Sequence, residues 1–195
     1  MLAISGLLSF ATVALAGKYN KKLNIGDPAP TFRGLVGIDD KTHSLDDYRD
    51  AKVVVICFTC NHCPVAVAYE DRFIQFVKDY KDKGVAFVAI NVNTIRADRL
   101  DKMKERAEKK GFNFDYLYDP SQKIGRAYGA TVTPHLFVLD GQRRIAYMGA
   151  FDDSKNPNRV KHHYVKDAVD ALLAGQTPPV TETRQFGCSI KYEGR

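Results

Sequence analysis

The chain has 195 residues, of which 45% are hydrophobic and 27% charged, and this suffices for one buried core without a second domain. The formal net charge is +6, from 29 basic and 23 acidic residues. The basic residues are scattered among acidic ones and no nucleic-acid recognition motif accompanies them, so we expect no nucleic-acid partner.

The N-terminus begins with an uncharged apolar segment. Residues 2–16 contain no charged side chain, end in Ala14-Leu15-Ala16 before Gly17, and are short for a membrane span. This pattern predicts a secretory signal over residues 1–16, export to the periplasm or another extracytoplasmic site, and one domain over residues 17–195. The usual cationic n-region is missing. A retained anchor, which alone would imply membrane association, a misassigned start codon and a plain apolar N-terminus of a cytoplasmic protein therefore stay open.

Short apolar runs alternate with amphipathic stretches from Ser44 onward, which predicts an α/β domain with a partly parallel sheet. The runs cover residues 53–58, 85–90 and 136–139 and are almost continuously apolar, as in strands covered on both faces. The turn at Asp140-Gly141-Gln142 predicts an antiparallel return strand after the last run.

Four helices are predicted from apolar residues spaced three or four apart. The inward faces contain Tyr69, Phe73, Phe76, Val77 and Tyr80; Leu100, Met103 and Ala107; Ile124, Ala127 and Tyr128; and Val165, Val169, Leu172 and Leu173. Gly175 ends the last helix, and a tail without clear periodicity follows from about residue 175.

The sequence Cys60-Asn61-His62-Cys63 lies between the first apolar run and the first predicted helix. Thiols at a helix N-terminus are stabilised as thiolates and lie within bonding reach of each other. We therefore predict that Cys60 attacks disulfides as an outward-facing thiolate of lowered pKa and that Cys63 resolves the mixed disulfide. Cys57 falls inside the apolar run and is expected to be an inert small hydrophobe.

Two neighbours of the dithiol should adjust its reactivity. A protonated His62 would stabilise a thiolate at Cys60, although His62 could also be an ordinary surface residue. Pro64 disfavours helical geometry at Cys63, so the helix could begin slightly later, after the second cysteine, and leave Cys63 more accessible.

Several motifs together resemble a thioredoxin-like redoxin family of the AhpC/TSA type, over about residues 23–192. They are Gly26-Asp27-Pro28-Ala29-Pro30 with Phe32, Cys60-Asn61-His62-Cys63-Pro64, Tyr69-Glu70-Asp71-Arg72, Tyr116-Leu117-Tyr118-Asp119, Tyr128-Gly129-Ala130, Thr133-Pro134 and Phe186-Gly187-Cys188-Ser189-Ile190-Lys191. The resemblance implies a thioredoxin-like α/β fold, with a central mixed sheet flanked by helices. It also implies a cis proline at Pro134 facing the dithiol, where an exposed Thr133 backbone would pair with an extended substrate. An ordinary trans proline is the alternative.

The remaining cysteine, Cys188, cannot be assigned from the sequence. It could pair with Cys57, act as an auxiliary resolving thiol, or remain reduced and buried, because disulfide formation depends on Cα separation. His135 follows Pro134 and is interpreted as a strand-start polar residue rather than a ligand or an acid–base group.

These features predict a thiol-disulfide oxidoreductase that acts on protein thiols or disulfides with an unidentified redox partner and needs no cofactor or metal. A thiol peroxidase is the second hypothesis, suggested by the resemblance. Its usual Pro-x-x-x-Thr-x-x-Cys pattern is absent, because Thr59 directly precedes Cys60 and no proline lies just upstream. A third hypothesis is a copper-binding module that uses Cys60, Cys63 and His135, since thiolates and imidazole suit Cu(I). The copper-delivery branch of the fold has a three-residue spacer, unlike this chain.

Overall fold

The computed structural model describes residues 17–194, so the predicted signal sequence lies outside the described residues. The strands are β1 (Leu35–Gly37), β2 (Thr42–His43), β3 (Val53–Phe58), β4 (Val85–Asn91), β5 (Asp115–Tyr118), β6 (Val132–Thr133), β7 (His135–Leu139), β8 (Ile145–Gly149) and β9 (Cys188–Ser189). The α-helices are α1 (Pro64–Tyr80), α2 (Leu100–Lys110), α3 (Lys123–Ala127) and α4 (Tyr164–Leu173), and the 3-10 helices are η1 (Leu45–Tyr48), η2 (Lys81–Lys83), η3 (Arg96–Asp98) and η4 (Pro157–Arg159).

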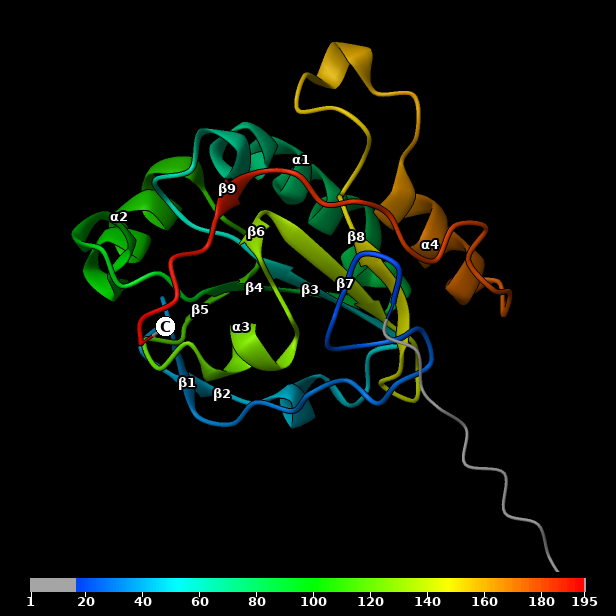
Figure 1. The fold of residues 1–195 in the computed structure, drawn as a ribbon, viewed down its shortest axis with the longest axis horizontal. Coiled ribbons are helices and arrows are strands. Elements are labelled where there is room, and N and C mark those ends of the chain that lie inside the picture. The colour runs from blue at the N-terminus through cyan, green and yellow to red at the C-terminus, as the bar shows by residue number, and fades with distance from the viewer. Residues whose placement is uncertain (1–16, 195) are drawn as a thin grey trace, which may run out of the picture.

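Within the described residues, seven strands form one mixed sheet in the order β2-β1-β5-β4-β3-β7-β8 (Figure 1). Strand β3 runs parallel to β4 and antiparallel to β7, and β4 runs parallel to β5. All six residues of β3 are buried, as the continuous apolar run predicts for a strand covered on both faces. The predicted α/β architecture with a central mixed sheet is confirmed.

Helices cover both faces of this sheet. Alternate β3 residues, Val53, Val55 and Cys57, pack in one core cluster with residues of α1, α2 and α4. The intervening residues of β3 pack in a second cluster with α3 and the N-terminal segment. This division follows from the two-residue period of a strand, which directs successive side chains to opposite faces.

All four predicted helices are present, as α1, α2, α3 and α4. The aromatic stripe of α1 is buried, including Tyr69 and Phe73. Helix α4 ends at Leu173, and Gly175 has a φ of 70°, the left-handed conformation that glycine adopts readily after a helix. The return strand predicted after Gly141 is β8, which pairs antiparallel with β7.

The C-terminal tail folds back over the domain. After α4 it forms hydrogen bonds with Met148 through Thr181 and Thr183, and its strand β9 then pairs antiparallel with β6. Figure 1 shows this tail in red, running from α4 across the molecule to β6 and α1. The docking of the tail could not be predicted from hydrophobic periodicity, because the tail is held by backbone hydrogen bonds and has no amphipathic face.

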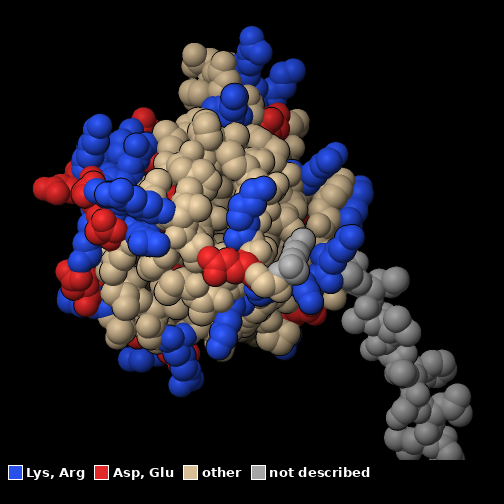
Figure 2. Space-filling model, turned by 60° about the vertical axis from the view of Figure 1, so that its left-hand side comes forward, with Lys and Arg blue, Asp and Glu red and all other residues tan. Residues whose placement is uncertain are grey.

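No helix in residues 17–194 combines the length and apolar character needed to cross a membrane. On the face drawn in Figure 2, Lys and Arg are spread around the molecule, interspersed with Asp and Glu. The dispersed charge expected from the sequence is visible on this face.

Candidate active site

The dithiol lies where β3 passes into α1. Strand β3 ends at Phe58, and Cys63 is the N-cap of α1, with Pro64 as the first helical residue. Cys63 has φ −75° and ψ 118°, the extended geometry that a following proline favours. The prediction that this would leave Cys63 more accessible is wrong, because Cys63 is completely buried.

Cys60 is also buried, with 2% of its surface exposed. The expected outward-facing thiol is therefore wrong for the described state. Cys60, Cys63 and Ala66 form a small buried cluster, against which Cys188 from the tail is packed. The tail thus covers the edge at which the sequence predicted an open dithiol.

The disulfide in this structure joins Cys63 to Cys188, with a Cα–Cα separation of 5.8 Å. Of the three alternatives for Cys188, pairing with Cys57 is excluded, because Cys57 is a free thiol buried in β3. Cys60 is also free, beside the disulfide. The CxxC pair is thus present, but its second cysteine is bonded to the tail.

The environment of the Cys60 thiol raises its pKa to about 11, opposite to the direction predicted from the helix N-terminus. The largest cause is burial, which disfavours the thiolate. The Thr133 hydroxyl, 3.1 Å from the Cys60 sulfur, lowers the pKa, while the Asp98 charge raises it. Backbone N–H groups of Cys63 and His62 also lower it. The stabilising groups predicted at a helix start are therefore present, but burial outweighs them.

Asp98 is a site residue that the sequence analysis missed. This completely buried carboxylate accepts hydrogen bonds from the backbone N–H of Asn61 at 2.8 Å and of His62 at 3.3 Å. Its other oxygen pairs with Nδ1 of His62. Asp98 follows β4, and adjacent parallel strands end at the same edge of a sheet, so its proximity to the end of β3 could have been inferred.

The Thr133-Pro134 peptide bond is cis, as the resemblance implied. The expected free Thr133 edge is absent, however, because Thr133 is buried and pairs with Cys188 in the β6–β9 ladder. The Thr133 carbonyl oxygen also lies 3.2 Å from the Cys63 sulfur. The residue predicted to bind substrate is therefore occupied by the protein's own tail.

His135 is a buried strand-start residue, as interpreted from the sequence. Burial lowers its pKa to about 3, so its ring is neutral at physiological pH. The ring lies 4.5 Å from that of Phe137, centroid to centroid. In this environment His135 contributes packing and carries no charge.

One group of potential metal ligands occurs in the described residues, and it differs from the copper hypothesis. Ligand atoms of Cys60, His62 and Asp98 lie within 4.8 Å of one another, and His135 is not in the group. Cys63 is bonded to Cys188, which removes its thiolate as a ligand. The Asp98 carboxylate and Nδ1 of His62 are hydrogen-bonded to each other, and this bond accounts for their proximity without a metal ion.

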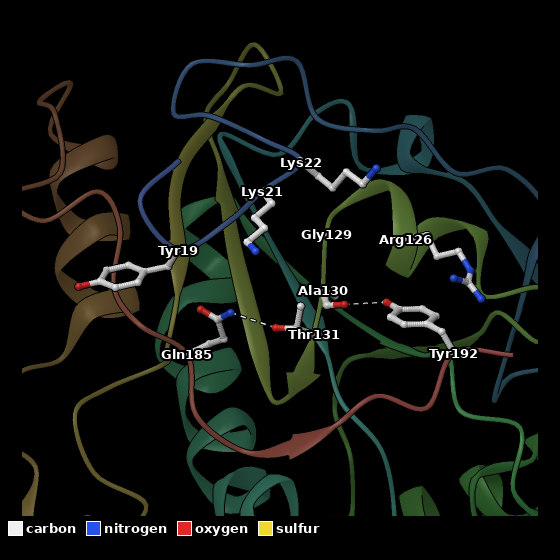
Figure 3. Close-up of a pocket in the computed structure, with 9 residues that line it drawn as sticks. All are labelled: Tyr19, Lys21, Lys22, Arg126, Gly129, Ala130, Thr131, Gln185 and Tyr192. Carbon is white, nitrogen blue, oxygen red and sulfur yellow. Dashed lines mark hydrogen bonds between the residues drawn. The ribbon is translucent and has the colours of Figure 1, made fainter. Parts of the chain in front are cut away.

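A cavity of about 520 Å³ is lined by Ala130 and Thr131, which directly precede β6 (Figure 3). The N-terminal segment, the end of α3 and the tail form its walls, and its basic side chains are Lys21, Lys22 and Arg126. Gln185 from the tail donates a hydrogen bond to Thr131 across the cavity wall. The lining residues include no cysteine.

The AhpC/TSA family model matches residues 25–148 of this chain. A relative from Mycobacterium tuberculosis (strain ATCC 25618 / H37Rv), named "Putative peroxiredoxin Rv2521", is 29% identical over 109 residues. That match covers 56% of this chain and 66% of the relative, just under two thirds of its length.

Solved structures also resemble this chain. A hypothetical protein from Sinorhizobium meliloti 1021 is 31% identical, with a TM-score of 0.83 and coverage of 90% of this chain and 98% of that one. An uncharacterized conserved protein from Geobacillus kaustophilus is 35% identical, also at 0.83, covering 88% and 94% of the two chains. A structure from Chlorobium tepidum titled as a thiol:disulfide interchange protein DsbE is 25% identical, with a TM-score of 0.58 and coverage of 65% and 84%.

Proposed function

Because this chain belongs to the AhpC/TSA family, we propose that it is a thiol-disulfide oxidoreductase acting on protein thiols or disulfides. The observation that carries the proposal is the Cys60/Cys63 pair at the start of α1, beside Thr133, in a thioredoxin-like fold. The DsbE-titled neighbour supports this reaction class. Export, predicted from residues 2–16, forms part of the proposal, since disulfide exchange suits an oxidising compartment.

In the proposed reaction, the Cys60 thiolate attacks a sulfur of the substrate disulfide, which joins Cys60 to the substrate and releases the other substrate sulfur as a thiolate. The Cys63 thiolate then attacks Cys60, which forms the Cys60–Cys63 disulfide and releases the substrate dithiol. The reverse sequence oxidises a substrate dithiol. The Thr133 hydroxyl and the N–H groups of His62 and Cys63 would stabilise the negative charge on Cys60 during these steps.

Variants of the dithiol test this proposal with a disulfide-bonded protein substrate. Cys60→Ser should abolish exchange. The double variant Cys63→Ser/Cys188→Ser should accumulate a mixed disulfide through Cys60, detectable by mass spectrometry, because both neighbouring resolving thiols are removed. Full exchange activity in Cys60→Ser would refute the assignment of Cys60 as the attacking residue.

Thiol peroxidase activity is the second candidate, favoured by the peroxiredoxin-named relative and by the Thr133 hydroxyl 3.1 Å from the Cys60 sulfur. A hydroxyl in that position could hold a peroxide beside a thiolate. Stopped-flow measurements of peroxide consumption by the reduced protein separate the candidates. Peroxide reduction much faster than exchange with a protein disulfide would favour the peroxidase.

A further inference from the structure

The tail strand β9 occupies an edge that an extended substrate would need. It pairs antiparallel with β6, with Cys188 opposite Thr133 and Ser189 opposite Val132. An extended peptide that adds to a strand edge makes the same kind of backbone contact. In the described state, β9 therefore blocks this edge from any other chain.

Gly187 brings the tail unusually close to this edge. A Cβ atom at residue 187 would overlap the carbonyl oxygen of Thr133 and lie 2.7 Å from its carbonyl carbon. Only glycine allows this approach without displacing the backbone. The seating of the tail on Thr133 thus depends on a specific residue beside Cys188.

The Cys63 sulfur has two cysteine neighbours. It is bonded to Cys188, and the free thiol of Cys60 lies in the same cluster and contacts Thr133 beside it. A two-residue spacer across a helix start is the arrangement in which two cysteines form a reversible disulfide. The Cys63 sulfur is therefore bonded to Cys188 and lies in the same cluster as the free thiol of Cys60.

We propose that Cys188 is a third redox-active cysteine, and that exchange of the Cys63 bond between Cys188 and Cys60 releases β9 from the substrate edge of β6. The Cys60 thiolate attacks the Cys63 sulfur, the Cys60–Cys63 bond forms, and the Cys63–Cys188 bond breaks. Cys188 leaves as a thiolate and takes up the proton that Cys60 lost. The exchange is an isomerisation, so no external oxidant or reductant is needed.

The inference rests on the proposed function and explains how a buried dithiol could act on a protein. With Cys188 released, segment 184–189 is held only by noncovalent contacts, namely the β6–β9 pairing, the hydrogen bond from Gln185 to Thr131 and the packing of Phe186 against Tyr69. These contacts can break reversibly while the chain on either side of the segment stays anchored. On one side Thr183 is hydrogen-bonded to Met148, and on the other Ile190 donates to Thr131. Displacement of this segment uncovers Thr133 and the new Cys60–Cys63 disulfide, which is the oxidised form that accepts electrons from a substrate dithiol.

Disulfide mapping of the oxidised full chain tests the exchange. Oxidised protein is held at pH 8 without added thiol or oxidant, quenched in acid, alkylated and digested, and the linked peptides are identified by mass spectrometry. The wild type should contain both Cys63–Cys188 and Cys60–Cys63 linkages. Cys60→Ser should retain Cys63–Cys188 alone.

A glycine substitution tests the link between the disulfide exchange and the tail without removing any cysteine. Gly187→Ala should raise the ratio of Cys60–Cys63 to Cys63–Cys188 by about tenfold, because the added methyl group opposes docking of β9. It should also speed oxidation of a reduced protein substrate. Ser189→Ala is the matched control, since Ser189 is exposed in the same strand and its substitution should leave the ratio unchanged.

The outcomes separate this inference from the proposed function. Cys188→Ser should form Cys60–Cys63 and remain active in exchange. If it does, but wild type never shows the Cys60–Cys63 linkage and Gly187→Ala leaves the ratio unchanged, the exchange is refuted and the function stands. If neither Cys188→Ser nor wild type exchanges disulfides with a protein substrate, the proposed function itself fails.

Discussion

Replacing Thr133 by valine isolates the contact between its hydroxyl and the Cys60 sulfur. Valine matches the shape of threonine but removes the hydroxyl oxygen, which lies 3.1 Å from that sulfur and lowers the Cys60 pKa. A hydrogen bond to a charged group contributes about 1.5–3 kcal/mol, and 1.36 kcal/mol corresponds to one pKa unit. Thr133→Val should therefore raise the pKa of Cys60 by roughly one to two units.

The shift is measurable as a pH profile of alkylation. Reduced Cys63→Ser protein, with and without Thr133→Val, is treated with iodoacetamide over a range of pH, and modification of Cys60 is followed by peptide mass spectrometry. At a pH below both pKa values, the rate should fall by about 10- to 100-fold in the Thr133→Val protein, because only the thiolate reacts.

Thr133→Ser retains the hydroxyl and is the matched control, so its profile should stay close to that of the Cys63→Ser parent. Identical profiles for the valine variant and the parent would refute the assigned role of this contact. Equal slowing by serine and valine would assign the effect to packing instead.

Three further predictions concern buried side chains other than the dithiol itself. Arg106→Ala should lower the free energy of unfolding by about 3 kcal/mol in denaturant titrations, because it leaves the buried Glu70 carboxylate without its ion-pair partner. The control Lys104→Ala removes an exposed ion pair with Asp40 and should lower it by less than about 1 kcal/mol. Burial lowers the pKa of His135 to about 3, so the unfolded chain binds more protons between about pH 6.5 and 3 and stability falls as pH falls through this window. The free energy of unfolding should therefore fall by about 2 kcal/mol between pH 7 and pH 5 because of His135, and His135→Phe should remove this contribution. An unchanged pH dependence in the variant would contradict a neutral, buried His135 ring. Burial raises the pKa of Cys57 well above its ordinary value, so Cys57 should resist alkylation in the native protein and react only after denaturation.

The fold could be predicted because its strands and helices have strong local patterns. The run 53–58 is apolar on both faces and becomes the central strand β3, while the spacing of Tyr69 and Phe73 places the buried face of α1. Strand β9 could not be predicted in this way, since two residues have no measurable periodicity. Its position depends on backbone pairing with β6, which lies more than fifty residues earlier in the chain.

The candidate site was predicted only in part for a related reason. The cysteine motif is visible in the local sequence, and the cis Thr133-Pro134 bond was implied by the family resemblance alone. The burial of Cys60 and the raised pKa of its thiol depend on Asp98 and on the tail, both distant in sequence. The position of Cys60 and Cys63 after the apolar run indicated which residues form the dithiol, but the electrostatic environment of the thiols depends on the tertiary structure.

The anchoring of the dithiol loop by Asp98 has a consequence for protein engineering. The loop makes hydrogen bonds to this carboxylate through the Asn61 and His62 N–H groups, and the Asn61 amide also donates to the Ala97 carbonyl oxygen. Transplanting only the Cys-Asn-His-Cys tetrapeptide into another scaffold would omit these acceptors. A functional graft therefore needs two separate stretches of chain, the tetrapeptide and the η3 turn, exchanged as a unit.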